Sequence, residues 1–223
     1  MSLTVAVPTL NHLEMSSIQD HVDSAIDGLL ASLPDPAQLT SECRRGIIAR
    51  YSAVLEGNFI YWMTGAYLAV RSDEARSKIL ENLHEEVRDS HPNMLRKFAI
   101  AANAVPTESD NWAVYWDLTN VRLFIGRLSA VPIVLTMAFF EGFIQRFMAF
   151  LAELAQWQGS TEMEYTDVHG VCDITHTQEL FRSLAAEMAI SPVEQETDIF
   201  EGMDLLRTLI DTIVEGAPAP ARN

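Results

Sequence analysis

The feature that most constrains the fold of this chain is a long apolar stretch in its second half. Residues 133–154 are apolar on nearly every side of a helix, and Pro132 stands where the first helical turn would begin. A helix that is apolar all round has to be covered by other segments. We therefore expect it to be the buried centre of a bundle. No segment alternates as a strand would, so the predicted fold class is all-α, with about seven or eight helices in one domain.

The rest of the chain divides into helical segments at prolines and capping residues. Residues 1–14 show no sustained period and are expected to form an arm, and residues 217–223 a frayed tail, which leaves 15–216 for the helical domain. The expected helices are 16–33, 40–70, 72–90 with Ser72 as its cap, 91–102, one beginning at 106–110, 133–154, 163–189 and one beginning at a capping box over 191–194.

Composition limits the kind of partner. The chain has 223 residues, 48% of them apolar, which suffices for one sizeable core but fits two domains poorly. Its formal net charge of −16 argues against nucleic acid and anionic membranes as partners, because both attract basic surfaces. A small-molecule substrate is compatible with this charge.

The compartment is inferred from cysteines and apolar runs. Cys43 and Cys172 lie far apart and define no disulfide framework, which favours a reducing cytoplasm. The N-terminal residues do not resemble a signal peptide. The most apolar run, 128–140, is too short to span a bilayer and is followed by Glu141. We therefore expect a soluble, cytoplasmic protein.

A candidate metal-binding pattern lies in the helix expected over 163–189. His169, Asp173 and His176 are spaced i, i+4 and i+7, so they share one face of a helix. Two imidazoles and a carboxylate form a partial ligand set for a transition metal. The alternative is a polar stripe on a solvated helix.

The same segment is a poor helix former by itself. Gly170 and several β-branched neighbours, among them Val171 and Ile174, cost on the order of 3 kcal/mol of intrinsic helicity relative to alanine. Either tertiary packing or metal coordination must compensate for this cost.

Glu141 is a carboxylate in the middle of the apolar helix. Burying an unpaired charge costs several kcal/mol, so this residue needs a partner. It is either a metal ligand or the partner of an arginine, for which Arg122, Arg127 and Arg146 are candidates.

A third cluster lies at the end of the helix expected over 72–90. Residues 81–91 contain three glutamates and two histidines. They form either a solvated acidic face or a further part of a metal site. Bundle metal sites draw carboxylates and histidines from several facing helices, which makes three such clusters more informative together than apart.

These residues resemble the haem-oxygenase-like dimetal oxidases and oxygenases. That superfamily shares its helical fold with haem oxygenase and the thiaminase-like proteins, and it includes a chlamydial death-domain-associated protein. The resemblance covers about residues 45–190. Position by position, it implies the metal ligands Glu85, His91, Glu141, His169, Asp173 and His176. The spacing between the first glutamate and its histidine varies in the family, so Glu86, Glu81 and His84 could each take the place of Glu85.

The resemblance also implies a function. In the family, two Fe(II)/Fe(III) ions share the carboxylates and use O2 as co-substrate, and no catalytic residue beyond the metal ligands is implied. The expected activity is oxidation of a small amino-acid-derived or carboxylic-acid substrate by N-oxygenation, oxidative C–C cleavage, decarboxylation or nitrile formation, as part of specialised biosynthesis. We expect a homodimer. Arg122 and Arg127 are candidates to bind a substrate carboxylate, the alternative being pairing with acidic neighbours or solvent.

Two other classes of protein compete with this interpretation. A metal-free, thiaminase-like enzyme would use a cysteine nucleophile, and Cys172 lies within the motif, where we expect it to face away from the histidines. A non-catalytic helical binding protein would use the polar groups only as salt-bridge partners.

Overall fold

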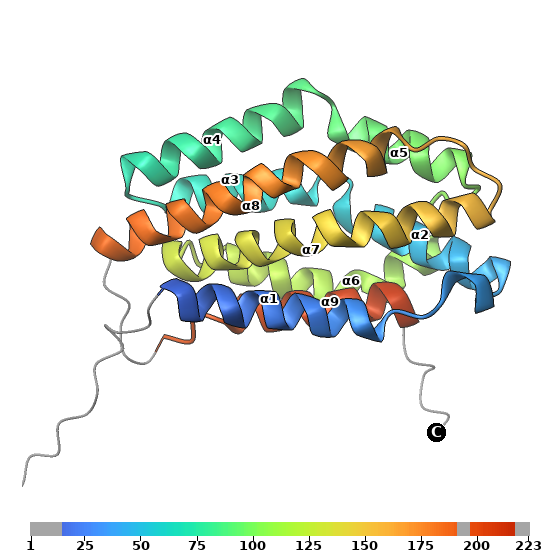
Figure 1. Cartoon of the computed structure of the whole chain (residues 1–223), viewed down its shortest axis with the longest axis horizontal. Coiled ribbons are helices and arrows are strands. Elements are labelled where there is room, and N and C mark those ends of the chain that lie inside the picture. The colour runs from blue at the N-terminus through green and yellow to red at the C-terminus, as the bar shows by residue number, and fades with distance from the viewer. Residues whose placement is uncertain (1–14, 191–196, 217–223) are drawn as a thin grey trace, which may run out of the picture.

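The computed structural model describes residues 15–190 and 197–216, and over these ranges it contains helices and no strand. The all-α fold class is therefore confirmed. In chain order the elements are α1 (Met15–Ser32), a short 3₁₀ helix (Pro36–Gln38), α2 (Ser41–Leu55), α3 (Asn58–Ala69), α4 (Asp73–Arg88), α5 (His91–Ala101), α6 (Glu108–Ile125), α7 (Ala130–Trp157), α8 (Glu164–Ile190) and α9 (Glu201–Glu215) (Figure 1).

The centre of the bundle is α7, as its apolar pattern predicts. It runs beside α8 along most of its length and also contacts α1, α2, α3 and α9 (Figure 1). Aromatic side chains on its several faces, including Phe139, Phe140 and Phe147, are buried. Since α7 and α8 form the most extensive helix pair, they define the frame on which the polar clusters are held.

The length of α7 corrects one expectation. The apolar run was expected to be too short to cross a membrane, but it lies in a helix of 28 residues that passes the length and hydropathy criteria for a span. In this fold, 78% of its most apolar window is buried inside the bundle. Its apolar surface is thus covered by protein, as in a core helix.

The segment 40–70, expected to be one helix, is two. Gly57 has a φ of 83°, in the left-handed region that favours glycine, and the chain breaks there between α2 and α3. Asn58 then donates its side-chain N–H to the carbonyl of Val54 at 2.7 Å. The break places Leu55 and Phe59, which lie on either side of it, beside the same internal cavity.

The junction of α4 and α5 brings two polar residues together. Ser72 caps α4 as predicted, since its Oγ accepts a hydrogen bond from the N–H of Ala75. After α4 ends, Ser90 adopts a left-handed φ of 58°, and α5 starts at once. This tight turn sets Glu86, in the last turn of α4, against His91, the first residue of α5.

The start of the last helix differs from expectation. The capping box expected over 191–194 lies outside the described residues, as do the arm over 1–14 and the tail over 217–223. Residues 197–200 are not helical, and α9 begins at Glu201 with Phe200 as its N-cap.

Candidate metal centre

The helix α8 presents its histidines and aspartate to the bundle interior. His169, Asp173 and His176 are 5%, 1% and 5% exposed, so this face is not a solvated polar stripe. The helix is continuous through the segment of low intrinsic helicity. Packing supports it there, because Gly142 of α7 leaves room for a close approach of the Thr177 methyl group.

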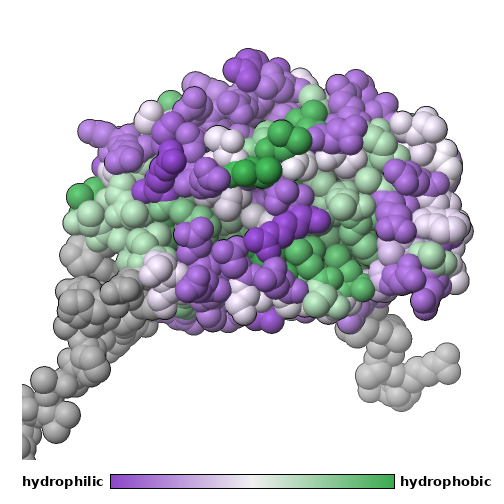
Figure 2. Space-filling view, in the orientation of Figure 1, coloured by the Kyte–Doolittle hydropathy of each residue, from purple (hydrophilic) through white to green (hydrophobic). Residues whose placement is uncertain are grey.

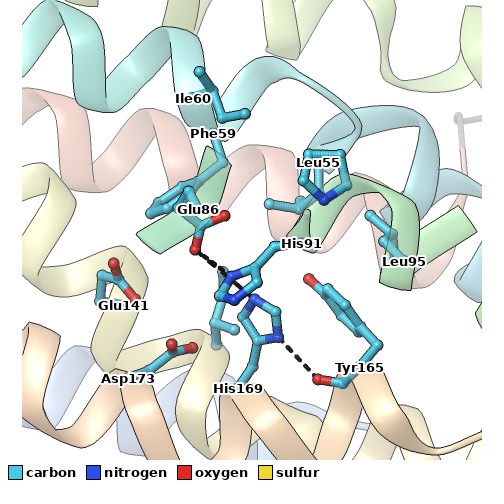
Figure 3. Close-up of a pocket in the computed structure, with 12 residues that line it drawn as sticks. Leu55, Phe59, Ile60, Glu86, His91, Leu95, Glu141, Tyr165, His169 and Asp173 are labelled. Atoms are coloured by element: carbon cyan, nitrogen blue, oxygen red, sulfur yellow. Dashed lines mark hydrogen bonds and ion pairs between the residues drawn. The ribbon is translucent and has the colours of Figure 1, made fainter. Parts of the chain in front are cut away.

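The first cluster consists of Glu86, His91 and His169 (Figure 3). Glu86 Oε1 lies 2.7 Å from Nδ1 of His91 and 3.9 Å from Nε2 of His169. Nδ1 of His169 lies 2.8 Å from the carbonyl oxygen of Tyr165, which fits an N–H donor at that atom. Nε2 of His169 is then the nitrogen with a free lone pair, and it faces Glu86.

The second cluster consists of Glu141, Asp173 and His176. Nδ1 of His176 lies 3.7 Å from Glu141 Oε1 and 3.6 Å from Asp173 Oδ1, distances too long for hydrogen bonds. Nδ1 of His176 and Oδ2 of Asp173 are buried and have no hydrogen-bond partner among the described residues. A bound cation would satisfy both of these buried atoms, the ring nitrogen and the carboxylate oxygen, so these residues fit a metal.

Both adjacent glutamates of α4 reach the centre, at different points. Glu86 belongs to the first cluster, whereas Oε2 of Glu85 lies 3.0 Å from Nε2 of His176, the ring nitrogen opposite the second cluster. Glu81 and His84, the remaining candidates from this helix, are exposed and belong to neither cluster, and Glu81 is paired with Lys78.

Sequence reasoning missed Asn82. This residue is 3% exposed and donates its side-chain N–H to Glu141 Oε1 at 2.8 Å. A signal was present, because Asn82 precedes Glu86 by four residues and therefore shares its helix face. Asn82 fixes the orientation of the buried carboxylate of Glu141.

The carboxylates of Glu86, Glu141 and Asp173 are all buried, and over the described ranges no lysine or arginine pairs with any of them. Burial, reinforced by the nearby charge of Asp173, raises the pKa of Glu141 well above its usual value. Within the described part of the chain the neighbouring polar groups are His91, His169, His176 and Asn82, so the three carboxylates stay buried only if protons or bound cations balance their charge.

The histidines respond to this negative field in different ways. Burial would lower the pKa of His176, but Asp173, Glu141 and Glu85 outweigh it and raise that pKa to about 10. Burial lowers the pKa of His169, which has weaker acidic contacts. Perturbed pKa values in a buried group of carboxylates and imidazoles are typical of a functional site.

Glu141 does not pair with an arginine in the part of the chain that the structure describes. Arg146, the nearest in sequence, forms ion pairs with Asp23 at 3.0 Å and Asp27 at 2.6 Å on α1. Its guanidinium is thereby held on the exposed side of the helix pair.

The two candidate substrate-binding arginines do not line the cavity at the centre. Arg122 donates to Asn58 Oδ1 at 2.8 Å and borders a separate surface pocket, and Arg127 pairs with Glu201 at 2.6 Å. Both arginines are thus engaged with neighbouring side chains.

Cys172 does not face away from the histidines as expected. Its Sγ donates to Asp173 Oδ1 at 3.1 Å and lies within 4.8 Å of the ligand atoms of Asp173 and His176. The reason is helical geometry: Cys172 and His176 are four residues apart and share a face. Burial, together with the charge of Asp173, raises the pKa of this thiol.

The comparisons with known proteins agree with this chemistry. A search of curated proteins found no significant match. The sequence profile of a family described as iron-containing redox enzymes matches residues 48–209, a range that includes both clusters, Asn82 and Glu85. The chain therefore belongs to this family of iron-containing redox enzymes, within the haem-oxygenase-like superfamily.

Proposed function

We propose that this protein is a non-haem di-iron oxygenase or oxidase that uses O2 to modify a small amino-acid-derived or other carboxylic-acid substrate. The observation that carries the proposal is the buried group of three carboxylates, Glu86, Glu141 and Asp173, which have no lysine or arginine partner among the described residues. Carboxylates buried in this way need bound cations to balance their charge. Because the family consists of iron-containing redox enzymes, we take the metal to be iron.

In this proposal, Glu86, His91 and His169 hold one iron, and Glu141, Asp173 and His176 hold the other. Glu86 takes the place that the sequence resemblance gives to Glu85, because it lies between the two histidines of the first cluster. Iron bound there would supply redox chemistry with O2. N-oxygenation, C–C cleavage, decarboxylation and nitrile formation are all compatible with this ligand set.

Other residues keep the ligands in place. Asn82 holds Glu141 by its hydrogen bond, and the carbonyl of Tyr165 fixes the ring of His169. The apolar neighbours Phe59 and Ile144 limit the access of water to the centre. These contacts act on ligand orientation and on the local dielectric, the two properties that surrounding residues usually control in a metal site.

The two competing classes are less well supported. A thiaminase-like nucleophile needs a thiolate, but the pKa of Cys172 is raised, and its thiol donates a hydrogen bond to Asp173. In a helical scaffold without a metal, buried carboxylates that lack cationic partners would lower the stability of the fold, and apolar residues in their place would raise it.

The proposal also includes a homodimer in the cytoplasm. Exposed apolar side chains on α6, Trp112, Trp116 and Leu123, support an interface between copies. On the face that Figure 2 draws, apolar side chains also gather in patches among polar ones. Light scattering measures the mass in solution, and a monomeric mass would remove this part of the proposal without affecting the metal centre.

The test is anaerobic reconstitution with Fe(II), followed by iron quantification and stopped-flow mixing with O2. We expect two irons per chain and an O2-dependent optical transient when a screen of free amino acids and fatty acids supplies the substrate. The Asp173→Asn variant should lose both the stoichiometry of two irons per chain and the O2-dependent transient. Asp167→Asn is the matched control, because Asp167 is an exposed aspartate on the same helix. Failure to bind iron in the unmodified protein would refute the proposal.

A further inference from the structure

The sulfur of Cys172 lies among the donor atoms of the second cluster. Its Sγ is 3.1 Å from Asp173 Oδ1 and lies within 4.8 Å of the donor atoms of both Asp173 and His176. Bonds to zinc of about 2.0–2.3 Å place neighbouring donor atoms of one ion roughly 3–4 Å apart. The 3.6 Å between His176 Nδ1 and Asp173 Oδ1 is of this size as well. A single cation can therefore contact the sulfur, the carboxylate and the imidazole together.

Two buried atoms beside this sulfur point to a ligand independently of the cysteine. Asp173 Oδ2 and His176 Nδ1 have no hydrogen-bond partner among the described residues, and these residues are 1% and 5% exposed. Glu141 faces the same ring nitrogen from α7, with its Oε1 3.7 Å away. The sulfur thus belongs to a set of donor atoms that a cation would satisfy.

The position of Cys172 on α8 explains why it reaches the cluster. Four residues separate it from His176, so the two side chains lie one turn apart on one face of the helix. Its neighbours Val171 and Ile174 are 71% and 47% exposed, whereas Cys172 is half-buried. Cys172 therefore lies where the buried face of α8 meets the surface.

The charge of the centre favours a thiolate at this position. Two divalent cations would carry four positive charges, against the three negative charges of the buried carboxylates in the two clusters. Glu85 does not supply the fourth within the second cluster, because it contacts Nε2 of His176, the ring nitrogen opposite that cluster. Burial and the charge of Asp173 raise the pKa of the Cys172 thiol in the metal-free protein. A bound divalent cation reverses this local field and binds the thiolate, while the proton passes to solvent.

We propose that Cys172 is a ligand of the second metal, and that the second site therefore prefers a thiophilic divalent cation such as Zn(II) or Co(II) more strongly than the first site does. This inference rests on the proposed function for the existence of the second site. Sulfur, nitrogen and oxygen donors meet there, whereas the first cluster offers only nitrogen and oxygen. Thiolate is the softest of these ligands and selects zinc over harder ions. The two sites of this chain thus differ in the metal that they select.

Anaerobic titration of the metal-free protein with Co(II) tests the proposal without turnover. A Co(II)–thiolate bond gives a charge-transfer band in the near ultraviolet, which nitrogen and oxygen ligands do not give. We expect two Co(II) ions per chain, with this band complete after the first equivalent, because the site that contains sulfur fills first. X-ray absorption of the protein loaded with one equivalent of Zn(II) should show one sulfur at about 2.3 Å.

The two cysteines of the chain allow a matched comparison. Cys172→Ser keeps the size of the side chain and a hydroxyl that can donate to Asp173, so a purely structural cysteine would be replaced without effect. We expect this variant to lose the band and to bind Co(II) at the second site roughly 100-fold more weakly, at or above the roughly 10–100-fold cost of losing an outer hydrogen-bond partner. Cys43→Ser is the control and should keep the band, because Cys43 is exposed on α2 and belongs to neither cluster. Cys172→Ala replaces Cys172→Ser if the latter fails to fold.

The outcomes separate this inference from the proposed function. Two Co(II) ions per chain without the band, or a band that persists in Cys172→Ser, would overturn the inference while the di-iron proposal stands. A band that grows evenly over both equivalents would overturn the difference in preference between the sites. If the unmodified protein binds only one Co(II), without the band, the second site itself is refuted. If the band appears as expected but the iron-loaded protein consumes no O2, the proposed oxidation fails and the assignment of Cys172 stands.

Discussion

Glu85 and His176 meet at 3.0 Å through Nε2 of the imidazole, and Nδ1 of the same ring faces Glu141 and Asp173. A hydrogen bond from Nε2–H to Glu85 would leave the lone pair of Nδ1 directed at the second cluster. Glu85 is then placed to orient a ligand, whereas its neighbour Glu86 is placed to be one.

This difference gives the first prediction. Glu86→Ala should lower the iron stoichiometry from two to one per chain, because it removes the carboxylate of the first cluster. Glu85→Ala should keep both irons but weaken the second by roughly 10–100-fold, the usual effect of removing a hydrogen-bond partner of a ligand. Anaerobic Fe(II) titration distinguishes the two cases. The assignment is reversed if Glu85→Ala loses an iron and Glu86→Ala does not.

The second prediction concerns Glu141. Its pKa is raised by burial, so the metal-free protein either buries a charge or takes up a proton. Glu141→Gln keeps the shape and removes that cost, and we expect it to stabilise the metal-free protein by on the order of 1 kcal/mol, which corresponds to roughly 2–4 °C in Tm at this size. The same variant should lose most of the stabilisation by Fe(II). A lower Tm without metal would contradict the idea that the carboxylate is kept for cation binding.

The third prediction is a pH dependence of the metal-free protein. The folded-state pKa of His176 is raised to about 10, above the unfolded value of about 6.5. Its contribution to stability is therefore fully present below pH 6.5 and is lost as the pH rises toward 10. The pKa of His169 is lowered, so its opposite effect is confined to pH values below 6.5.

Thermal melts in a chelator between pH 6.5 and 9.5 should therefore show Tm falling as the pH rises. His176→Gln should flatten this slope. Metal binding needs an unprotonated ring and therefore strengthens as the pH rises, so with Fe(II) present the slope should disappear or change sign. A pH-independent Tm in the chelated protein would contradict the third prediction.

The fourth prediction follows from the low intrinsic helicity of residues 169–176. Part of the free energy that keeps this segment helical should come from the metal, because both clusters draw ligands from it. Hydrogen exchange should show stronger protection of these amides with Fe(II) than with a chelator. The buried amides of α9 serve as the reference, since that helix contributes to neither cluster. Equal protection in both states would assign the helicity to packing alone.

Much of the fold can be predicted from the sequence because the patterns that indicate its helices extend over several turns. The apolar pattern of α7 extends over many turns, and the spacing of His169, Asp173 and His176 fixes one face of α8 irrespective of where that helix ends. The break at Gly57 did not follow, because a single glycine inside a continuous apolar pattern is compatible with either one helix or two.

The choice between Glu85 and Glu86 could not be made from sequence for a different reason. Adjacent residues differ by about 100° around a helix, so both can border a site that lies between two helices. Which of them meets His91 depends on the turn at Ser90. The backbone of Ser90 is left-handed, and the sequence does not predict this, because the residue is neither glycine nor asparagine. Asn82 was overlooked because an amide in a charged segment is typical of an exposed face, whereas here it holds Glu141.

The last prediction tests the packing that holds α9 against the core. An added Cβ at Gly202 would collide with the hydroxyl of Thr136 and the ring of Phe124, both buried, so Gly202→Ala should destabilise the protein by roughly 1–3 kcal/mol. Gly28 is exposed in the middle of α1, and no described residue lies near its Cβ position, so Gly28→Ala should stabilise the protein by about 0.5–1 kcal/mol through helix propensity. Urea unfolding measures both changes. Iron stoichiometry should stay unchanged in each variant, because neither glycine lies in the two clusters; loss of iron in Gly202→Ala would show that α9 supports the metal centre through α7.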